Sequence, residues 1–249
     1  MQALLRSAVS DAAANLSEFV PSLSTCEVLA FGEGVAEIHF DDGKANVMST
    51  DWLRELGGLL DRAEKDEARA VLFRGRPGMF SGGLNMKWLP TLTPESGREL
   101  VETFSGTMLR VWSFPIPTVA AVTGHAVAGG CVLTSACDQR FAIDGPFRIQ
   151  MNEVLVGMAM PTWASLICQS AFPVPQATEL LLLARPFSPK EAHAIGVLQG
   201  LAADEAELLA KVRAAARALA AVGPRPYAIT KARLRSAAVE HAKSVLFNE

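Results

Sequence analysis

The sequence predicts one α/β fold in which short strands and helices alternate along most of the chain. Short apolar runs bounded by glycine or proline are separated by longer segments with leucine or alanine at helical spacing. Two glycine pairs, at residues 82–83 and 129–130, each come after a strand-like run and before a helix-like segment. This recurrence of strand, loop and helix indicates β-rich units coiled in succession, although parallel α/β winding of the ordinary kind fits it equally well.

Composition excludes several classes of protein. Of the 249 residues, 50% are hydrophobic and 20% charged, and the net charge is −3, which argues against disorder and against a nucleic-acid-binding surface. A chain of this length can bury a proper core without disulfides or metals. Its four cysteines form no CxxC pair, and three lie in apolar surroundings, which is typical of reduced core cysteines. The sequence therefore predicts a cytoplasmic protein.

No segment is predicted to enter a membrane. Residues 1–23 contain acidic and polar residues where a signal peptide needs an unbroken apolar run, so we expect a helical N-terminal extension. Residues 116–137 contain no Asp, Glu, Lys or Arg, and His125 is their one basic side chain; the stretch is long enough to span a bilayer. Glycines, threonines and serines interrupt this stretch, and a buried strand, a glycine turn and a buried helix fit it better.

The elements follow in order along the chain. Residues 26–41 hold two β-rich runs split by "GEG", a hairpin pattern, and a Ser-Thr-Asp cap then opens a leucine-rich helix at residues 49–66. A strand is expected at 68–75, a helix at 94–111 and a strand at 117–124. From residue 188 the pattern is mostly helical, with an alanine-rich segment and a last helix after "GPRPYAITK".

The glycine pairs point to a ligand as well as to packing. Glycine where a strand meets a helix lets backbone N–H groups approach a ligand, and the helix N-terminus adds partial positive charge. Two loops that each offer one N–H to the same point would form an oxyanion hole. The glycines could equally serve only a tight turn and close helix–strand packing. Neither loop matches the dinucleotide or P-loop pattern, so a nucleotide site is not expected.

Four segments in order resemble the crotonase superfamily, the enoyl-CoA hydratases and isomerases. They are "DDGKANVMS" (41–49), "GMFSGGLNMK" (78–87), "VAAVTGHAVAGGCVLTSACDQRFA" (119–142) and "FRIQMNEVLVGMAMP" (147–161). The resemblance implies a spiral of repeated ββα units over residues 24–190 and a helical trimerisation region over 191–249. It also implies a homotrimer or a dimer of trimers.

The resemblance further implies an acyl-CoA thioester substrate, with no cofactor beyond the coenzyme A it carries. The oxyanion donors would be the backbone amides of Gly82 and Gly129, although position 82 is more often alanine in the family pattern. Coenzyme A would lie near the loop of residues 41–49. The residues implied to contact it are Lys44, Ala45, Asn46 and Lys87.

The acid/base residues decide which reaction is expected. Hydratases of this superfamily use two glutamates, because water must be activated and the α-carbon protonated. Here one position matches Glu153 and the other matches Val132, which cannot titrate. This pattern resembles the enoyl-CoA double-bond isomerases, in which one carboxylate moves a proton between two carbons. Apolar neighbours should desolvate Glu153 and raise its pKa, which favours its action as a base.

Other reactions remain open at this point: a hydratase with another polar group, a thioesterase, a decarboxylase, or a silent CoA-binding or assembly protein. Two residues favour the catalytically silent protein: Val132, and Asn85, which stands where the family usually has aspartate. His125 and Asp138 are interpreted as structural, and the scattered histidines show no metal-ligand spacing. The acyl chain is expected to contact a pocket formed by Met86, Trp88, Leu89, Trp112, Val132 and Met158.

Overall fold

The computed structural model describes residues 26–31 and 34–247. The helix expected within residues 1–23 lies outside this range. The largest sheet of the described chain has six strands in the order β1-β2-β4-β7-β9-β11. β1 and β2 form the expected antiparallel hairpin, and every other neighbouring pair is parallel. Its strands are β1 (Cys26–Phe31), β2 (Val35–Phe40), β4 (Ala70–Arg74), β7 (Thr118–Val122), β9 (Gln139–Ile143) and β11 (Gly200–Ala202).

The chain repeats one pattern around this sheet. After a strand of the large sheet it adds a short strand to a second layer and then turns into a helix. This is the predicted spiral of ββα units, and it excludes ordinary parallel winding. The second layer consists of β3 (Val47–Met48) paired with β6 (Gly83–Leu84), and of β5 (Gly78–Ser81), β8 (Gly124–Val127) and β10 (Ile149–Gln150). The helices of these units are α2 (Thr50–Lys65), η2 (Leu89–Thr91), α3 (Pro94–Trp112), α4 (Gly129–Ala136), η3 (Glu153–Val156) and α5 (Thr162–Ala171).

Local sequence explains where the first long helices begin. The hydroxyl of Ser49 accepts a hydrogen bond from the amide of Trp52 and so caps α2, as the sequence predicts. Thr93 and Ser96 form a reciprocal capping box at the start of α3. Each helix then buries the face that carries its apolar residues in the larger hydrophobic core, where α2 and α3 pack on each other.

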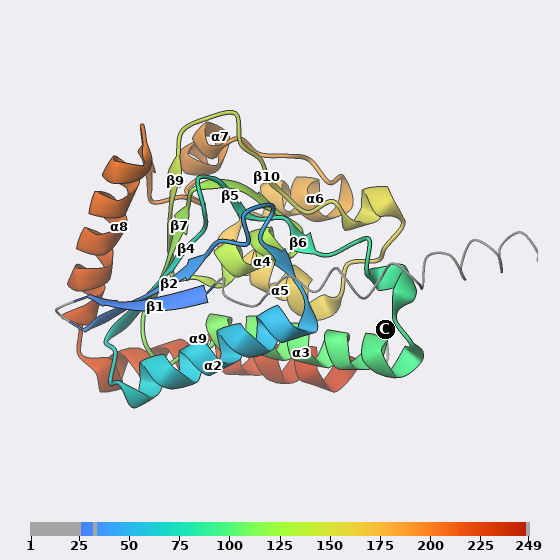
Figure 1. Cartoon of the computed structure of the whole chain (residues 1–249), viewed down its shortest axis with the longest axis horizontal. Helices are drawn as coiled ribbons and strands as arrows, with labels where there is room; N and C mark the ends of the chain where they lie inside the picture. Colours follow the sequence, from blue (N-terminus) through green and yellow to red (C-terminus); the bar gives the residue numbers. More distant parts are fainter. Residues whose placement is uncertain (1–25, 32–33, 248–249) are drawn as a thin grey trace, which may run out of the picture.

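The large sheet has a helical layer on each side. In Figure 1, α8 (Glu205–Ala220) stands alone beside one face, whereas α2, α3 and α9 (Pro224–Val245) run together along the bottom of the view. Alternate residues of β4 serve the two cores: Ala70 and Leu72 pack under α8, and Val71 and Phe73 pack into the larger core. The remaining helices are α6 (Val174–Leu182) and α7 (Pro189–Ala194).

The boundary predicted at residue 190 does not separate two structural parts. β11 lies within the region expected to be helical, yet it pairs with β9 and completes the large sheet. α8 packs on β4, β7 and β9. A strand as short as Gly200–Ala202 shows no usable alternation of apolar and polar residues, which is why the sequence did not indicate it.

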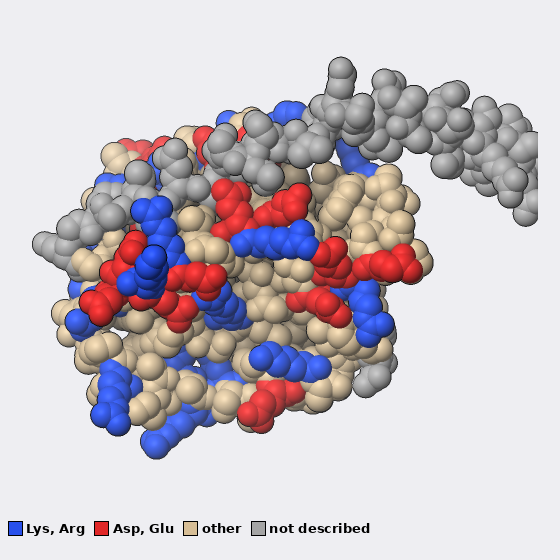
Figure 2. Space-filling view, turned by 60° about the horizontal axis from the view of Figure 1, so that its bottom comes forward, with Lys and Arg blue, Asp and Glu red and all other residues tan. Residues whose placement is uncertain are grey.

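Ion pairs join the helices of the lower layer. Arg110 of α3 lies 2.7 Å from carboxylate oxygens of both Asp61 and Glu64 on α2, and Arg54 of α2 pairs with Glu99 of α3. Figure 2 turns this face toward the viewer and shows basic and acidic side chains interspersed rather than gathered by sign. Such a mixed face agrees with the small net charge of −3.

The uncharged stretch at 116–137 contains the expected buried strand, β7, and the expected buried helix, α4, but the strand β8 lies where only a glycine turn was expected. Within the described residues, no helix is both long and apolar enough to cross a membrane.

Candidate active site

The two glycine loops meet at the start of α4. A methyl group built on Gly83 would lie 2.6 Å from the amide nitrogen of Gly129 and 2.8 Å from Cβ of Ala128. One built on Gly130 would lie 2.2 Å from the carbonyl oxygen of Ser81. Real side chains do not tolerate such contacts, so glycine is required where the loops approach. The contact brings together the two segments that the sequence singled out.

Gly129 can offer its amide to a ligand. It is the first residue of α4, and the earliest helical bond of this turn runs from the amide of Val132 to the carbonyl of Ala128 at 3.0 Å. The amide of Gly129 therefore has no partner within its own helix, where the helix dipole also favours negative charge. Gly129 is buried and sits at the meeting point of the loops.

Gly82 does not supply the second donor, contrary to the sequence prediction. Its amide donates a 2.8 Å hydrogen bond to the carbonyl of Ala45 and is engaged within the loop. The amide of Asn85 donates to the carbonyl of Met48 at 3.4 Å, on the side of β3. Because successive residues of a strand direct their N–H groups to opposite sides, the amide of Leu84 points away from β3. Leu84 therefore replaces Gly82 as the candidate partner of Gly129.

Glu153 has the environment expected of a general base. It begins η3 directly after β10 and the link Met151–Asn152. Burial raises the pKa of its carboxyl above the ordinary value, against opposing hydrogen bonds from the backbone amides of Glu153 and Asn152. Its Oε2 is buried and has no hydrogen-bond partner. Such an unsatisfied carboxylate oxygen is costly for stability and is characteristic of functional sites.

The charge of Glu153 acts on a residue of α4. A hydrogen bond with Cys168 and burial are the main causes that raise the pKa of the Cys131 thiol, and the charges of Cys168 and Glu153 add to them. Cys131 lies two residues beyond Gly129 on the same helix. The carboxylate therefore acts on the same helix that begins with Gly129. Val132, at the position of the missing second glutamate, is buried in this helix.

The residues predicted to line the acyl pocket lie in different surroundings, and Trp112 does not belong with the others. Trp88 and Leu89 pack partly buried around η2, whereas Met86 and Met158 are exposed. Trp112 is the last residue of α3, at the end of that helix far from η2. Its indole Nε1 donates a hydrogen bond to the hydroxyl of Ser170 on α5. A helix of 19 residues spans about 28 Å, so Trp112 cannot line the same pocket as η2.

Two residues near the amides escaped the sequence prediction. A methyl group on Gly129 would lie 2.8 Å from Cζ of Phe104 and 2.9 Å from Sδ of Met48, so both side chains border this amide. Phe104 also makes an edge contact with Trp163, with ring centroids 4.9 Å apart. In the sequence, Phe104 shows only the helical spacing of a core residue. Nothing in that pattern separates a wall of the site from ordinary core.

The residues expected to contact coenzyme A divide into two kinds. Asn46 is buried, and its amide nitrogen donates to the carbonyls of Phe40 at 3.0 Å and Phe80 at 3.1 Å. Its side chain therefore joins the loop of residues 41–49 to β5, and the prediction that Asn46 contacts a ligand is wrong. Ala45 is half-buried and serves the loop through its carbonyl, whereas Lys44 and Lys87 are exposed.

His125 has the contacts of a packed histidine, which agrees with its structural interpretation from the sequence. Its Nδ1 accepts a hydrogen bond from the amide of Arg148 at 3.1 Å, and its ring meets Phe147 edge-on. Burial and the charge of Arg148 lower its pKa. Over residues 26–31 and 34–247, no group of His, Cys, Asp and Glu is arranged to hold a metal ion.

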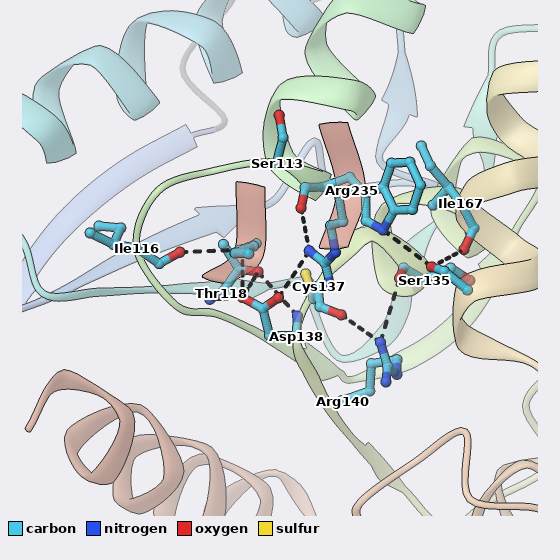
Figure 3. Close-up of polar contacts among 12 residues, drawn as sticks. Ser113, Ile116, Thr118, Ser135, Cys137, Asp138, Arg140, Ile167 and Arg235 are labelled. Atoms are coloured by element: carbon cyan, nitrogen blue, oxygen red, sulfur yellow. Dashed lines mark hydrogen bonds and ion pairs between the residues drawn. The ribbon is translucent and has the colours of Figure 1, made fainter. Parts of the chain in front are cut away.

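Asp138 has a larger structural role than the local turn that the sequence indicated. Figure 3 shows it between β7 and the C-terminal helix α9. Its Oδ2 accepts hydrogen bonds from the amide of Thr118 at 2.8 Å and from Nζ of Lys231 at 2.7 Å, and its Oδ1 lies 3.0 Å from Nη1 of Arg235. Burial alone would raise the pKa of Asp138, but the two cations outweigh it and hold the pKa below its ordinary value.

Comparison with known proteins agrees with this geometry. A family model described as enoyl-CoA hydratase/isomerase matches residues 30–247. The chain belongs to this family. It is 28% identical over 209 residues to human mitochondrial enoyl-CoA delta isomerase 1, covering 83% of this chain and 69% of that protein. It is 31% identical over 202 residues to a probable enoyl-CoA hydratase of Bacillus subtilis, covering 80% and 78%.

Solved structures confirm the crotonase fold. The crystal structure of human mitochondrial delta3-delta2-enoyl-CoA isomerase matches with a TM-score of 0.85 at 26% identity, over 89% of this chain and 87% of that one. The enoyl-CoA hydratase/isomerase family is therefore the one to which the sequence motifs pointed. Its relatives include both isomerases and hydratases by name.

Proposed function

We propose that this family member is an enoyl-CoA double-bond isomerase that uses Glu153 as its only base. The observation that carries the proposal is the pairing of a desolvated Glu153 with an apolar Val132 where hydratases have a second glutamate. One carboxylate is enough to move a proton between two carbons of the same acyl chain. Addition of water needs a second group to handle the water.

The proposed reaction begins at the α-carbon of a 3-enoyl thioester. Glu153 removes a proton from C2, the electron pair moves toward the thioester carbonyl, and a dienolate forms. The amides of Leu84 and Gly129 donate hydrogen bonds to the oxygen that gains negative charge. The protonated Glu153 then returns the proton to C4, and the double bond ends between C2 and C3. The proton that leaves C2 is the one returned to C4, so the reaction needs no cofactor beyond coenzyme A itself.

A hydratase is the second candidate, because two relatives more than 30% identical to this chain are named as a probable and a putative enoyl-CoA hydratase. Isotope exchange separates the two functions. With 2-enoyl- and 3-enoyl-CoA substrates in deuterated water, an isomerase exchanges hydrogens at C2 and C4 and adds no hydroxyl group. Formation of 3-hydroxyacyl-CoA would identify a hydratase instead. Binding of acyl-CoA without any exchange would contradict both and indicate a silent CoA-binding protein.

Coenzyme A is proposed to lie against the exposed Lys44 and Lys87, whose ammonium groups would attract its phosphates. Replacing both by alanine should raise KM several-fold and leave kcat nearly unchanged, because these contacts are remote from the reacting carbons. The increase in KM should be smaller at high salt, because salt screens exposed charges. Steady-state kinetics at two ionic strengths checks this. An unchanged KM would place the nucleotide elsewhere.

A homotrimer or a dimer of trimers is proposed for the assembly. Large apolar side chains are exposed on η3 and around α6, among them Leu155, Val174, Leu182 and Leu183. A surface of this kind is characteristic of subunit contacts. Sedimentation at micromolar concentration should therefore show no monomer, and a monomeric species would contradict the proposal. The cytoplasmic location also stays a prediction, to be checked by fractionation.

A further inference from the structure

Ala128 adopts a backbone conformation that alanine rarely takes. Its φ is +51° and its ψ is −121°, and it is the residue that caps the start of α4 directly before Gly129. Residues with a Cβ are disfavoured there, and such conformations persist only where the surrounding structure determines them. Strained residues of this kind gather at sites that need a fixed geometry. Here the strain lies next to an amide assigned to the thioester oxygen.

Contacts on three sides hold Ala128 in place. Its amide donates to the carbonyl of Gln150 at 2.8 Å, and its carbonyl accepts from the amide of Val132 at 3.0 Å. Its methyl group rests against the other glycine loop, where a Cβ on Gly83 would come within 2.8 Å of it. Gly83 itself has a φ of +79° and precedes Leu84. The methyl group thus sits between the two loops that carry the proposed donors.

We propose that Ala128 is a positioning residue for the oxyanion hole. Its fixed backbone directs the amide of Gly129, and its methyl group acts as a spacer against Gly83 that sets the distance to the amide of Leu84. Glycine would satisfy the same dihedral angles without strain, but it would remove the spacer and allow the peptide before Gly129 to rotate. Preorganised donors stabilise developing charge because they need not reorient during the reaction. This inference rests on the proposed function of the two amides.

Ala128→Gly tests the inference. Small displacements of aligned groups are costly to the rate, so kcat should fall about ten- to a hundredfold while KM changes little. The thermal midpoint should not fall, because backbone strain is released. Ala184→Gly is the matched control: Ala184 also has a positive φ, +50°, but it follows α6 and carries no assigned donor. Its kcat should stay that of the wild type. Ala128→Ser, which keeps Cβ, should restore most of the rate.

A second measurement reports the hydrogen bonds without turnover. A CoA thioester whose carbonyl is conjugated to an aromatic ring absorbs at longer wavelength when donors polarise that carbonyl. Wild type and Ala184→Gly should shift its absorption equally, and saturated Ala128→Gly should shift it less. An undiminished shift together with an unchanged kcat would overturn the role of Ala128 alone. A wild-type protein that binds the probe without any shift would overturn the proposed function and this inference with it.

Discussion

Glu153→Gln lowers the rate of proton exchange on a verified enoyl-CoA substrate by about two to four orders of magnitude, the usual contribution of a general base. Glutamine keeps the size and hydrogen-bonding capacity of the side chain but cannot accept the proton from C2. Binding of the substrate should change little. Exchange in deuterated water, followed by NMR or mass spectrometry, measures the loss.

The same substitution should not destabilise the fold. Burial raises the pKa of Glu153, so the folded protein holds a proton that the unfolded chain has released once the pH exceeds the ordinary value near 4.5. Stability from this residue is therefore present below that value and is lost as pH rises through the raised pKa. Glutamine does not ionise, so it carries no cost for burying a charge. Denaturant unfolding at pH 7 should give a free energy of unfolding equal to or above that of the wild type.

Glu55→Gln provides a matched control. Burial raises the pKa of Glu55 as well, and its Oε2 is also buried without a hydrogen-bond partner, but it lies on α2. Its replacement should leave exchange unchanged. If Glu153→Gln retains full activity on a substrate that the wild type converts, the base has been assigned wrongly. An equal loss in both variants would indicate a general effect of removing buried carboxylates.

Asp138→Asn should cost about 3–5 kcal/mol in the free energy of unfolding, the loss typical of breaking a buried ion pair from one side. Asparagine can still accept hydrogen bonds from Thr118. It leaves Lys231, whose side chain is only 5% exposed, and Arg235 without the negative charge that offsets their burial. Urea unfolding measures the loss. Asp66→Asn removes one partner of an exposed pair with Arg62 and should cost far less.

The pH dependence of Asp138 has the opposite sign to that of Glu153. Its pKa is held below the ordinary value of 3.8, so its contribution is fully present above that value and is lost as pH falls through the lowered pKa. The difference in stability between wild type and Asp138→Asn should therefore narrow in acid. A difference that stays constant from neutral pH to below 3.8 would show that the charge of Asp138 is not what stabilises α9.

Much of the fold could be predicted because its local patterns are strong. Caps at Ser49 and Thr93 mark helix starts, and β4 and β7 are continuous apolar runs of the kind found in parallel sheets. The residue pattern alone does not indicate the second layer, because strands such as Val47–Met48 are too short to show any period, and only the family resemblance implied it. The strand β11 was missed for the same reason, and with it the continuity of the chain beyond residue 190.

The candidate backbone donor from the sequence and the one from the structure differ by two residues, and the predictions for side chains differ more. Gly82 and Leu84 belong to the same loop, but only hydrogen bonding shows which amide is engaged. Asn46 has a polar side chain in the right loop, yet it joins two loops internally, which no sequence pattern reveals. Ala128 is informative only through its dihedral angles. Glu153 could be predicted because its apolar neighbours and its motif both point to a desolvated base.

Two buried carboxylates have cationic partners that are synthesised much later. Glu37, which is fully buried on β2 and pairs first with Arg74, also accepts from Arg213, 176 residues further along, and Asp138 pairs with Lys231 across 93 residues. A chain leaving the ribosome must carry Asp138 without Lys231 until α9 has emerged. Contacts so distant in sequence make folding slow, and an incomplete chain exposes apolar surface meanwhile. Folding to the native state can therefore be completed only after α9 has been synthesised.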